Sequence, residues 1–461
     1  MTPEALRWRD EARALRAGQQ MIEAEQAMAR ARALAPGDPL IAFLHAQLRY
    51  ELGHPAADLF AAVARQWPDN LDAVRNQALA EASEGRPERA VGLLSAAVQR
   101  HPGWAEGHRV LAALEWVRGN TAGYDASYAV AVGAEPGNAA LWLGWFGAVA
   151  QLRDWPRARR IVAAAESDLG PHRALLEARL FIASESGDEA ETARLLALTA
   201  GWPQPFVRIA AIRHALRQGA PDRALALALP VAERAPASSE AGQVWPYVAT
   251  CWRLLDDPRA GWLDGEGAFV RVHDVALSSA DLAELASLLR TLHGFQLPYA
   301  EQSVRGGTQT DRSVLLRHEP VMQRTRAALL AAVEDYVATL PPPDAAHPLL
   351  GRPRGRQLIS GSWSVRLGGG GFNVAHSHPQ GWLSSAFYVS LPQPEQLGPA
   401  PAGHFHYGAP PEALGLGLAP RATIAPRVGQ VVLFPSTLWH GTLPFAEGER
   451  LNIAFDVVPA A

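Results

Sequence analysis

Two kinds of chain break recur at regular intervals through the first half of the sequence. Proline-containing turns come every 32 to 35 residues, at Pro36, Pro68, Pro102, Pro136, Pro171, Pro203 and Pro236. A second series of turn residues lies between them, at Gly53, Gly85, Gly119, Asp154, Gly187 and Gly219. The segments between breaks place apolar residues three and four positions apart, as in Ala90, Leu93, Leu94 and Ala97. Each segment therefore predicts a short helix with one face to bury, and each repeat predicts two such helices.

These two interleaved series of turn residues resemble the tetratricopeptide repeat over about residues 20–255. The period matches, a proline follows the second helix of each repeat, and a glycine or aspartate lies in the turn between the two helices. The resemblance implies an α-superhelix, which we assign to residues 1–255. Such a superhelix has a concave face that commonly holds a peptide or a partner protein. We therefore expect a protein or peptide partner at this part of the chain.

The period is lost after residues 251–259, and a different pattern follows. Helices are predicted at 279–293 and 320–340, enclosing a glycine-rich polar loop at 302–311. From residue 358 onward, short alternating segments between glycine and proline turns predict strands at 358–367, 384–391, 403–407, 422–425, 430–434 and 450–458. The predicted fold class is thus multidomain α + β, with a sandwich or jelly roll and supporting helices at residues 256–461.

Composition refines this picture mainly by exclusion. The 461 residues are 48% hydrophobic and 19% charged with a net charge of −4, which indicates a globular protein without a cationic surface for nucleic acid or an anionic membrane. All 42 basic residues are arginine, so Schiff-base chemistry on a lysine and a phosphate-binding loop ending in Gly-Lys are excluded. The single Cys251 excludes an internal disulfide and a cysteine-based metal cage. With an acidic N-terminus and no long apolar run, we expect a cytoplasmic protein.

Three histidines and one arginine in the second half of the sequence are candidates for a functional site. His376 and His378 lie two residues apart, so an extended strand would place both side chains on one face. His440 follows 62 residues after His378, directly behind a predicted buried strand, and Arg450 opens the last predicted strand ten residues later. For any one of these histidines, taken alone, a structural role is the simpler interpretation.

The set resembles the pattern of 2-oxoglutarate and Fe(II) dependent oxygenases: a His-x-(Asp or Glu) pair, a later histidine, and an arginine about ten residues after it. The segment 305–310, the stretch 376–385 with Pro379 and Trp382, and Phe434-Pro435-Ser436 resemble a bacterial branch often fused to tetratricopeptide repeats. The resemblance runs from about Trp252 to the C-terminus. It implies a double-stranded β-helix (jelly roll) that uses Fe(II), 2-oxoglutarate and O₂ to hydroxylate a substrate.

The resemblance also assigns roles to individual residues. It implies that His376, His378 and His440 hold the metal on one face, and that Arg450 pairs with the distal carboxylate of 2-oxoglutarate. Arg305 and Gln309 either line the mouth of the pocket or stabilise their glycine-rich loop. Trp382, Tyr388 and Asn452 are further candidates for the pocket.

The sequence departs from the family pattern at His378, where a carboxylate is usual. Three neutral imidazoles would leave the metal more positive, so its affinity and reactivity could differ. A second pair, His404-Phe405-His406, could compete for the metal, and the glycine run 368–371 predicts a flexible hairpin before the metal-binding strand. Two alternatives to the hydroxylase stay open: a protein-interaction scaffold with a degenerate oxygenase domain, and a three-histidine metal dioxygenase of the cupin type that needs no arginine.

Overall fold

The computed structural model describes residues 2–460, and its backbone contacts divide the chain into two compact units. The first unit holds the residues up to 152 together with 291–300 and 310–326. The second holds 153–290, 301–309 and the residues from 327 onward. The second unit thus contains the last repeat helices as well as the C-terminal strands, and a domain boundary at residue 255 stays a prediction.

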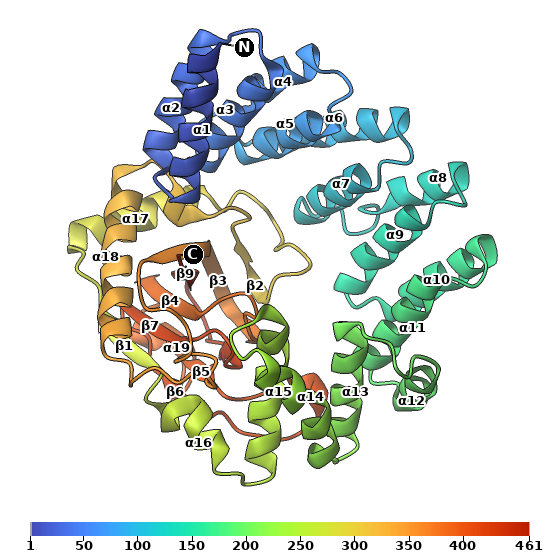
Figure 1. The fold of residues 1–461 in the computed structure, drawn as a ribbon, viewed down its shortest axis with the longest axis vertical. Coiled ribbons are helices and arrows are strands. Elements are labelled where there is room, and N and C mark those ends of the chain that lie inside the picture. Colours follow the sequence, from blue (N-terminus) through green and yellow to red (C-terminus); the bar gives the residue numbers. More distant parts are fainter. Residues whose placement is uncertain (1, 461) are drawn as a thin grey trace. The chain divides into compact units, whose positions relative to one another are not determined.

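The first unit is built from helical hairpins that follow one another along the chain (Figure 1). Its repeat helices are α1 (Pro3–Ala17), α2 (Met21–Leu34), α3 (Pro39–Glu51), α4 (Ala57–Gln66), α5 (Leu71–Ser83), α6 (Pro87–Arg100), α7 (Ala105–Val117), α8 (Ala126–Ala134) and α9 (Ala139–Gln151). The side chains of Thr2, Asp38 and Asn70 accept hydrogen bonds from first-turn N–H groups of α1, α3 and α5. Gly53 and Gly85 adopt φ values of +81° and +79° in the turns between paired helices, a conformation that favours glycine.

Two segments from the second half of the sequence complete the first unit. Phe295 and Tyr299 pack against the apolar cluster of α6 and α7, and the Trp116 indole N–H donates to the carbonyl of Pro298 at 3.0 Å. The ring of His318 stacks on that of His54, with centroids 3.7 Å apart. The repeat period alone does not predict these contacts.

The second unit continues the helical hairpins and adds a sheet. Its repeat helices are α10 (Trp155–Leu169), α11 (Arg173–Ser186), α12 (Glu189–Leu198), α13 (Pro205–Arg217), α14 (Pro221–Arg234), α15 (Ser239–Leu254) and the short α16 (Arg259–Asp264). The later helices are α17 (Ser279–Thr291), α18 (Pro320–Ala338), of which residues up to Arg326 are counted with the first unit, and α19 (Pro394–Leu397). The tetratricopeptide-like array and both later helices predicted at 279–293 and 320–340 are confirmed. None of the helices within residues 2–460 is both long and apolar enough to cross a bilayer.

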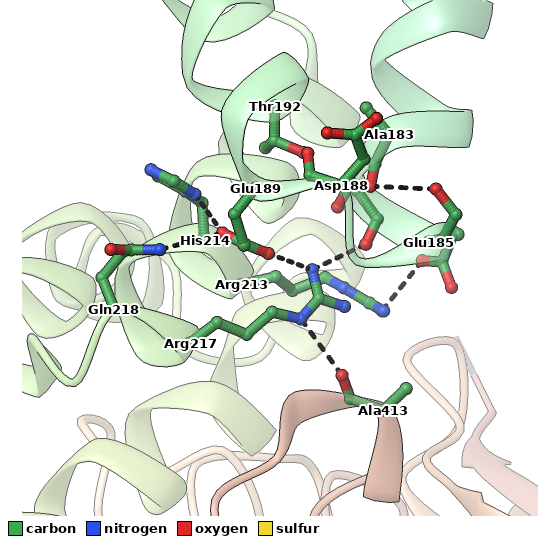
Figure 2. A network of polar contacts seen from close by, with 12 residues as sticks. Ala183, Glu185, Asp188, Glu189, Thr192, Arg213, His214, Arg217, Gln218 and Ala413 are labelled. Carbon is green, nitrogen blue, oxygen red and sulfur yellow. Dashed lines mark hydrogen bonds and ion pairs between the residues drawn. The ribbon is translucent and has the colours of Figure 1, made fainter.

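The last repeat helices and the C-terminal segment share one hydrophobic core. Buried residues of α13, α14 and α15 form a cluster with Leu414 and Trp439. Figure 2 shows Arg217 of α13 donating to the Ala413 carbonyl at 3.1 Å and to the Glu189 carboxylate at 3.2 Å. Apolar and polar contacts therefore both join these repeat helices to the segment that carries the predicted site.

Within the described residues, nine strands form one curled antiparallel sheet in the second unit. The strands are β1 (Arg271–Asp274), β2 (Val304–Gln309), β3 (Gln357–His376), β4 (Leu383–Ser390), β5 (Phe405–Tyr407), β6 (Ala422–Ile424), β7 (Gln430–Pro435), β8 (His440–Thr442) and β9 (Arg450–Pro459). Their order is β1-β7-β4-β9-β3-β8-β5-β6, and β2 pairs with β3. The predicted fold class, helical repeats followed by an antiparallel β domain, is confirmed.

Two predictions about glycine-rich segments were wrong. The segment expected as a loop at 302–311 contains β2, which accommodates its paired glycines through a bulge between Arg305 and Gly307. A Cβ atom on Gly307 would lie only 2.2 Å from the carbonyl oxygen of Arg366, so glycine allows the two strands to approach. The hairpin expected at 368–371 is likewise absent: β3 extends through these glycines to His376, and the register shift against β2 falls on them.

Candidate metal and cosubstrate site

Three histidines from different parts of the sheet meet at one point. His376 is the last residue of β3, His378 lies in the turn that follows, and His440 opens β8. The antiparallel register of β3 and β8 places His376 directly opposite His440. Ring centroids lie 4.3 Å apart for His376 and His440, 5.0 Å for His376 and His378, and 5.1 Å for His378 and His440. One nitrogen from each ring lies within 4.8 Å of the others, so the three can share one metal ion.

Each of the three rings has an oxygen partner at Nδ1. The acceptors are the Val374 carbonyl at 2.7 Å for His376, the Asp456 carboxylate at 2.5 Å for His378, and the Leu438 carbonyl at 3.0 Å for His440. Because these oxygens only accept, Nδ1 of each ring carries the proton and Nε2 is left as the metal-binding atom. Outer hydrogen bonds of this kind fix the tautomer and orientation of metal-ligating histidines.

Burial gives two of the rings the neutral form that a metal needs. Burial, with a smaller contribution from the charge on His378, lowers the pKa of His376 to about 3. Burial also lowers the pKa of His440 well below its usual value, and His376 and His378 add to this effect. At neutral pH both side chains are therefore uncharged, which is the state that binds a divalent cation.

His378 differs from the other two because a carboxylate stands behind it. Burial opposes its charged form, but the negative charge of Asp456 and the hydrogen bond to its carboxylate together outweigh burial and raise the pKa of His378. Asp456 lies on β9, and its other oxygen accepts a hydrogen bond from the Ser384 hydroxyl at 2.6 Å. Sequence reasoning missed Asp456: it lies inside a predicted strand, and nothing in its local sequence indicates its distant partner.

A tight turn brings His378 to this carboxylate. The backbone N–H of His378 donates to the Ser436 carbonyl at 2.9 Å, and that of Gly381 donates back to the His378 carbonyl at 3.0 Å. A Cβ atom on Gly381 would lie 2.4 Å from the Ser436 hydroxyl, so only glycine lets the turn pack this closely. The turn sequence therefore determines where the second histidine of the pair lies.

Arg450 is a buried cation with no acidic partner among residues 2–460. Its side chain is 2% exposed, donates one hydrogen bond to the Gly403 carbonyl at 2.7 Å, and lies over the ring of Tyr388 at 4.9 Å. Burial lowers the pKa of Arg450 from its ordinary high value. An uncompensated buried guanidinium is costly, and an incoming carboxylate would offset that cost.

Three buried polar atoms at this place have no hydrogen-bond partner: Nε of Arg450, the hydroxyl of Tyr388 and Oδ1 of Asn452. Arg450 and Asn452 are two residues apart on β9, and Tyr388 of β4 is directly opposite Asn452. Alternation along strands therefore places the three side chains on the same face of the sheet. The arrangement provides donors and an acceptor for a small anionic ligand and fits the distal carboxylate of 2-oxoglutarate.

The remaining predicted pocket residues have structural partners. The Arg305 guanidinium donates to the carbonyls of Gln302 and Val304, at 2.9 and 2.7 Å, so it stabilises the start of β2. Gln309 is paired with Val365 of β3. The indole N–H of Trp382 donates to the Leu349 carbonyl at 2.9 Å. A role of these three residues in the pocket stays a prediction.

The donor set suits a divalent first-row metal. Imidazole nitrogen is a ligand for iron, nickel, copper and zinc alike, and three ligands from one side leave coordination positions for other molecules. The aromatic rings of Phe434 and Phe405 lie 4.5 and 6.0 Å from that of His440 and keep one side of the cluster apolar. His376, His378 and His440 thus fit a mononuclear metal centre with open positions.

Comparison with known proteins adds a family match for the segment that contains this site. Residues 361–456 match the profile of the family described as "Putative 2OG-Fe(II) oxygenase". This segment includes all three histidines, Arg450 and Asp456. The predicted fusion of tetratricopeptide-like repeats to an oxygenase domain is therefore confirmed. A search of curated protein sequences found no match.

Solved structures resemble separate parts of the chain at low identity. A tetratricopeptide repeat protein from Parabacteroides merdae is 14% identical, with a TM-score of 0.34 over 55% of this chain and 98% of its own. HygX from Streptomyces hygroscopicus, solved with nickel and 2-oxoglutarate bound, is 16% identical, with a TM-score of 0.30 over 44% of this chain and 87% of its own. A Pseudomonas putida prolyl-4-hydroxylase is 17% identical, with a TM-score of 0.29 over 43% of this chain and 97% of its own.

Proposed function

From an oxygenase-family segment at residues 361–456, carried behind tetratricopeptide-like repeats, we propose that this protein is a 2-oxoglutarate and Fe(II) dependent dioxygenase that hydroxylates a protein or peptide. One observation supports this proposal most strongly. The same sheet holds three histidines whose Nε2 atoms are left for a metal and a buried arginine that has no acidic partner within the described residues.

His376, His378 and His440 would hold the Fe(II) ion through Nε2. When bound there, Fe(II) supplies the redox chemistry by which O₂ and 2-oxoglutarate together oxidise a substrate C–H bond. The chain's own contribution is to keep two of the imidazoles neutral by burial and all three oriented through their Nδ1 hydrogen bonds.

Arg450 would bind the distal carboxylate of 2-oxoglutarate. Its unpartnered Nε and the nearby hydroxyl of Tyr388 can both donate to a carboxylate, and the guanidinium can do so through parallel hydrogen bonds. In a site this buried, a charge-assisted pair is stronger than it would be in water. Arg450 would therefore select a dicarboxylate cosubstrate over a ligand that lacks the distal charge.

The substrate class is inferred from the helical repeats. Arrays of this kind provide extended surfaces suited to peptides and proteins, and the chain carries such an array together with the oxygenase segment. A protein or peptide recruited by the repeats and oxidised at the metal site accounts for the presence of both in one chain.

The test is an anaerobic preparation of the full chain with Fe(II), followed by titration with 2-oxoglutarate and measurement of succinate after O₂ is admitted. The proposal predicts metal binding, saturable 2-oxoglutarate binding and succinate release that all require His376 and His440. If neither metal nor 2-oxoglutarate binds, the scaffold alternative replaces the enzyme. If metal and O₂ react without any need for 2-oxoglutarate or Arg450, the three-histidine cupin-type alternative replaces it.

A further inference from the structure

The carboxylate of Asp456 lies close to the three histidines. It hydrogen-bonds to His378, the residue that stands where the family pattern has a carboxylate. Asp456 Oδ2 lies 2.5 Å from Nδ1 of His378, and Oδ1 lies 2.6 Å from the Ser384 hydroxyl. Because both carboxylate oxygens already accept hydrogen bonds, Asp456 is not arranged as a direct ligand. It is also outside the group of side chains that can share one ion.

The surroundings of Asp456 are built around it. Ser384 is directly opposite Asp456 in the pairing of β4 and β9, and its hydroxyl also hydrogen-bonds to the Ser436 hydroxyl at 2.9 Å. Asp456 is 7% exposed and both serines are 1% exposed or less. Gly381 leaves the space into which the Ser436 hydroxyl fits. Burial and the hydrogen bond from Ser384 fix the position of this carboxylate independently of His378, so it can hold the ring of His378 in turn.

We propose that Asp456 is a positioning residue for the metal, which directs Nε2 of His378 toward the ion and supplies the negative charge that a carboxylate ligand would otherwise provide. This inference rests on the proposed function, because it concerns the same metal. It explains how a His-x-His pair can serve where a His-x-carboxylate pair is usual. The negative charge of Asp456 stays near the ion, but Asp456 acts on the ion through the imidazole ring of His378 and not by direct contact.

The two other histidines show why the role falls to this residue. Nδ1 of His376 and Nδ1 of His440 both donate to neutral backbone carbonyls, which orient the rings but bring no charge. Only His378, among the three, has an ionisable acceptor. Hydrogen bonds to a carboxylate are stronger than those to a neutral oxygen and increase the basicity of the imidazole as a ligand.

The experiment measures binding of Co(II) as an oxygen-stable probe to the full-length wild type and to Asp456→Asn and Asp456→Ala, by titration and by the visible absorption bands of the bound ion. Asparagine keeps an oxygen that can accept from Nδ1 of His378 but removes the charge, and alanine removes both. Loss of such an outer partner typically weakens metal affinity by about 10–100-fold. We expect a loss in that range for Asp456→Asn, a larger loss for Asp456→Ala, and shifted absorption bands in both.

The matched control is Asp264→Asn. Asp264 is a carboxylate of almost the same exposure, 6%, in the same unit, and it pairs with Arg421 at 2.9 Å and accepts from the Glu266 backbone N–H at 3.0 Å. This control should keep wild-type Co(II) affinity and absorption bands. Thermal unfolding of each metal-free variant separates loss of folding from loss of metal affinity.

Should Asp456→Asn fail to fold, Ser384→Ala decides the question, because it keeps the carboxylate and removes the hydroxyl that anchors it independently of His378. A several-fold loss of Co(II) affinity is then expected, and unchanged affinity overturns the inference. Wild-type Co(II) affinity in a folded Asp456→Asn also overturns it and leaves the proposed function standing. A wild type that binds neither Co(II) nor Fe(II) overturns both together.

Discussion

Two His-x-His pairs occur in the sheet of the second unit, and only one belongs to the three-histidine group. His376 is the last residue of β3 and His378 follows it in the turn, whereas His406 lies in β5 and His404 directly precedes that strand. β8 pairs with both strands: His440 is opposite His376 on one side and opposite Tyr407 on the other. His406 is opposite Gly441, one position further along. Because neighbouring residues of a strand point to opposite faces, this offset of one residue turns the His406 ring away from the face of His440.

Hydrogen bonding separates the two pairs in a second way. The Nδ1 atoms of His376 and His378 have close oxygen partners. Nδ1 of His406 is buried without any partner, and Nδ1 of His404 lies 3.4 Å from the Thr423 hydroxyl, a long contact. The comparison teaches that His-x-His spacing alone does not bring three histidines together. Register with a third histidine, and an oxygen partner for the second ring nitrogen, distinguish the first pair from the second.

The largest expected effect is loss of metal binding when histidines of the three-histidine group, and not those of the second pair, are substituted. We expect His376→Ala combined with His440→Ala to abolish Fe(II) and Co(II) binding at metal concentrations that saturate the wild type, because two of three ligands are lost. His404→Gln combined with His406→Gln should retain metal binding. Calorimetric titration of both double variants checks this. Loss of binding in the second variant alone would show that the other pair holds the metal.

The next effect concerns the cosubstrate and leaves the metal ligands untouched. Arg450→Ala should weaken 2-oxoglutarate binding to the metal-loaded protein by roughly 2–5 kcal/mol, typical of breaking a buried charge pair, or about thirtyfold or more in Kd. Metal affinity should change little, because all three histidines remain. Arg427→Ala, at an exposed arginine, is the control. Weakened metal binding with unchanged 2-oxoglutarate affinity would contradict the role given to Arg450.

The sequence predicted the helical repeats and six of the strands because these depend on local periodicity. Strands β1 and β8 were missed, whereas the equally short β5 and β6 were predicted as parts of the alternating segments 403–407 and 422–425. Strand β2 was missed because glycine was interpreted as a loop former. In fact Gly306, at φ +68°, and Gly307 permit a bulge and a close backbone approach.

The same limit applies to the site. His376, His378, His440 and Arg450 could be selected from the sequence because a family pattern fixes their order and spacing. Asp456 could not, because its contact with His378 spans 78 residues and depends on the β4–β9 register and the turn at Gly381. Long-range pairing of this kind is set by tertiary structure, and local sequence does not encode it.

A smaller effect is expected from helix α15, which packs behind the first pair. The Trp439 indole N–H, next to His440, donates to the Pro246 carbonyl at 3.0 Å, and a Cβ atom on Gly242 would lie 2.4 Å from the carbonyl oxygen of Pro379, next to His378. Gly242→Ala should therefore displace the Pro379 turn. We expect a free energy of unfolding lower by about 1–3 kcal/mol, as for overpacking, and several-fold weaker metal binding.

The control for this change is Gly147→Ala in α9. An added Cβ there meets no atom within 4 Å, so the substitution should be neutral or stabilise the helix. Chemical denaturation of both variants, with and without Co(II), provides the comparison. Equal effects of the two substitutions would mean that α15 does not support the metal-binding turn.

The smallest effect is a pH dependence that belongs to the second pair. Burial lowers the pKa of His406, so the unfolded chain, with an ordinary histidine pKa near about 6.5, binds a proton more readily than the folded one. The unfolded state then holds more protons, and the free energy of unfolding falls as pH falls below that value and is fully retained above it. In the metal-free protein, His406→Gln should therefore reduce the loss of stability between pH 7.5 and pH 5.5, as measured by urea unfolding. The control His101→Gln, at an exposed histidine, should leave that loss of stability unchanged. An equal pH dependence in the wild type and in His406→Gln would show that the neutral ring of His406 contributes nothing to stability.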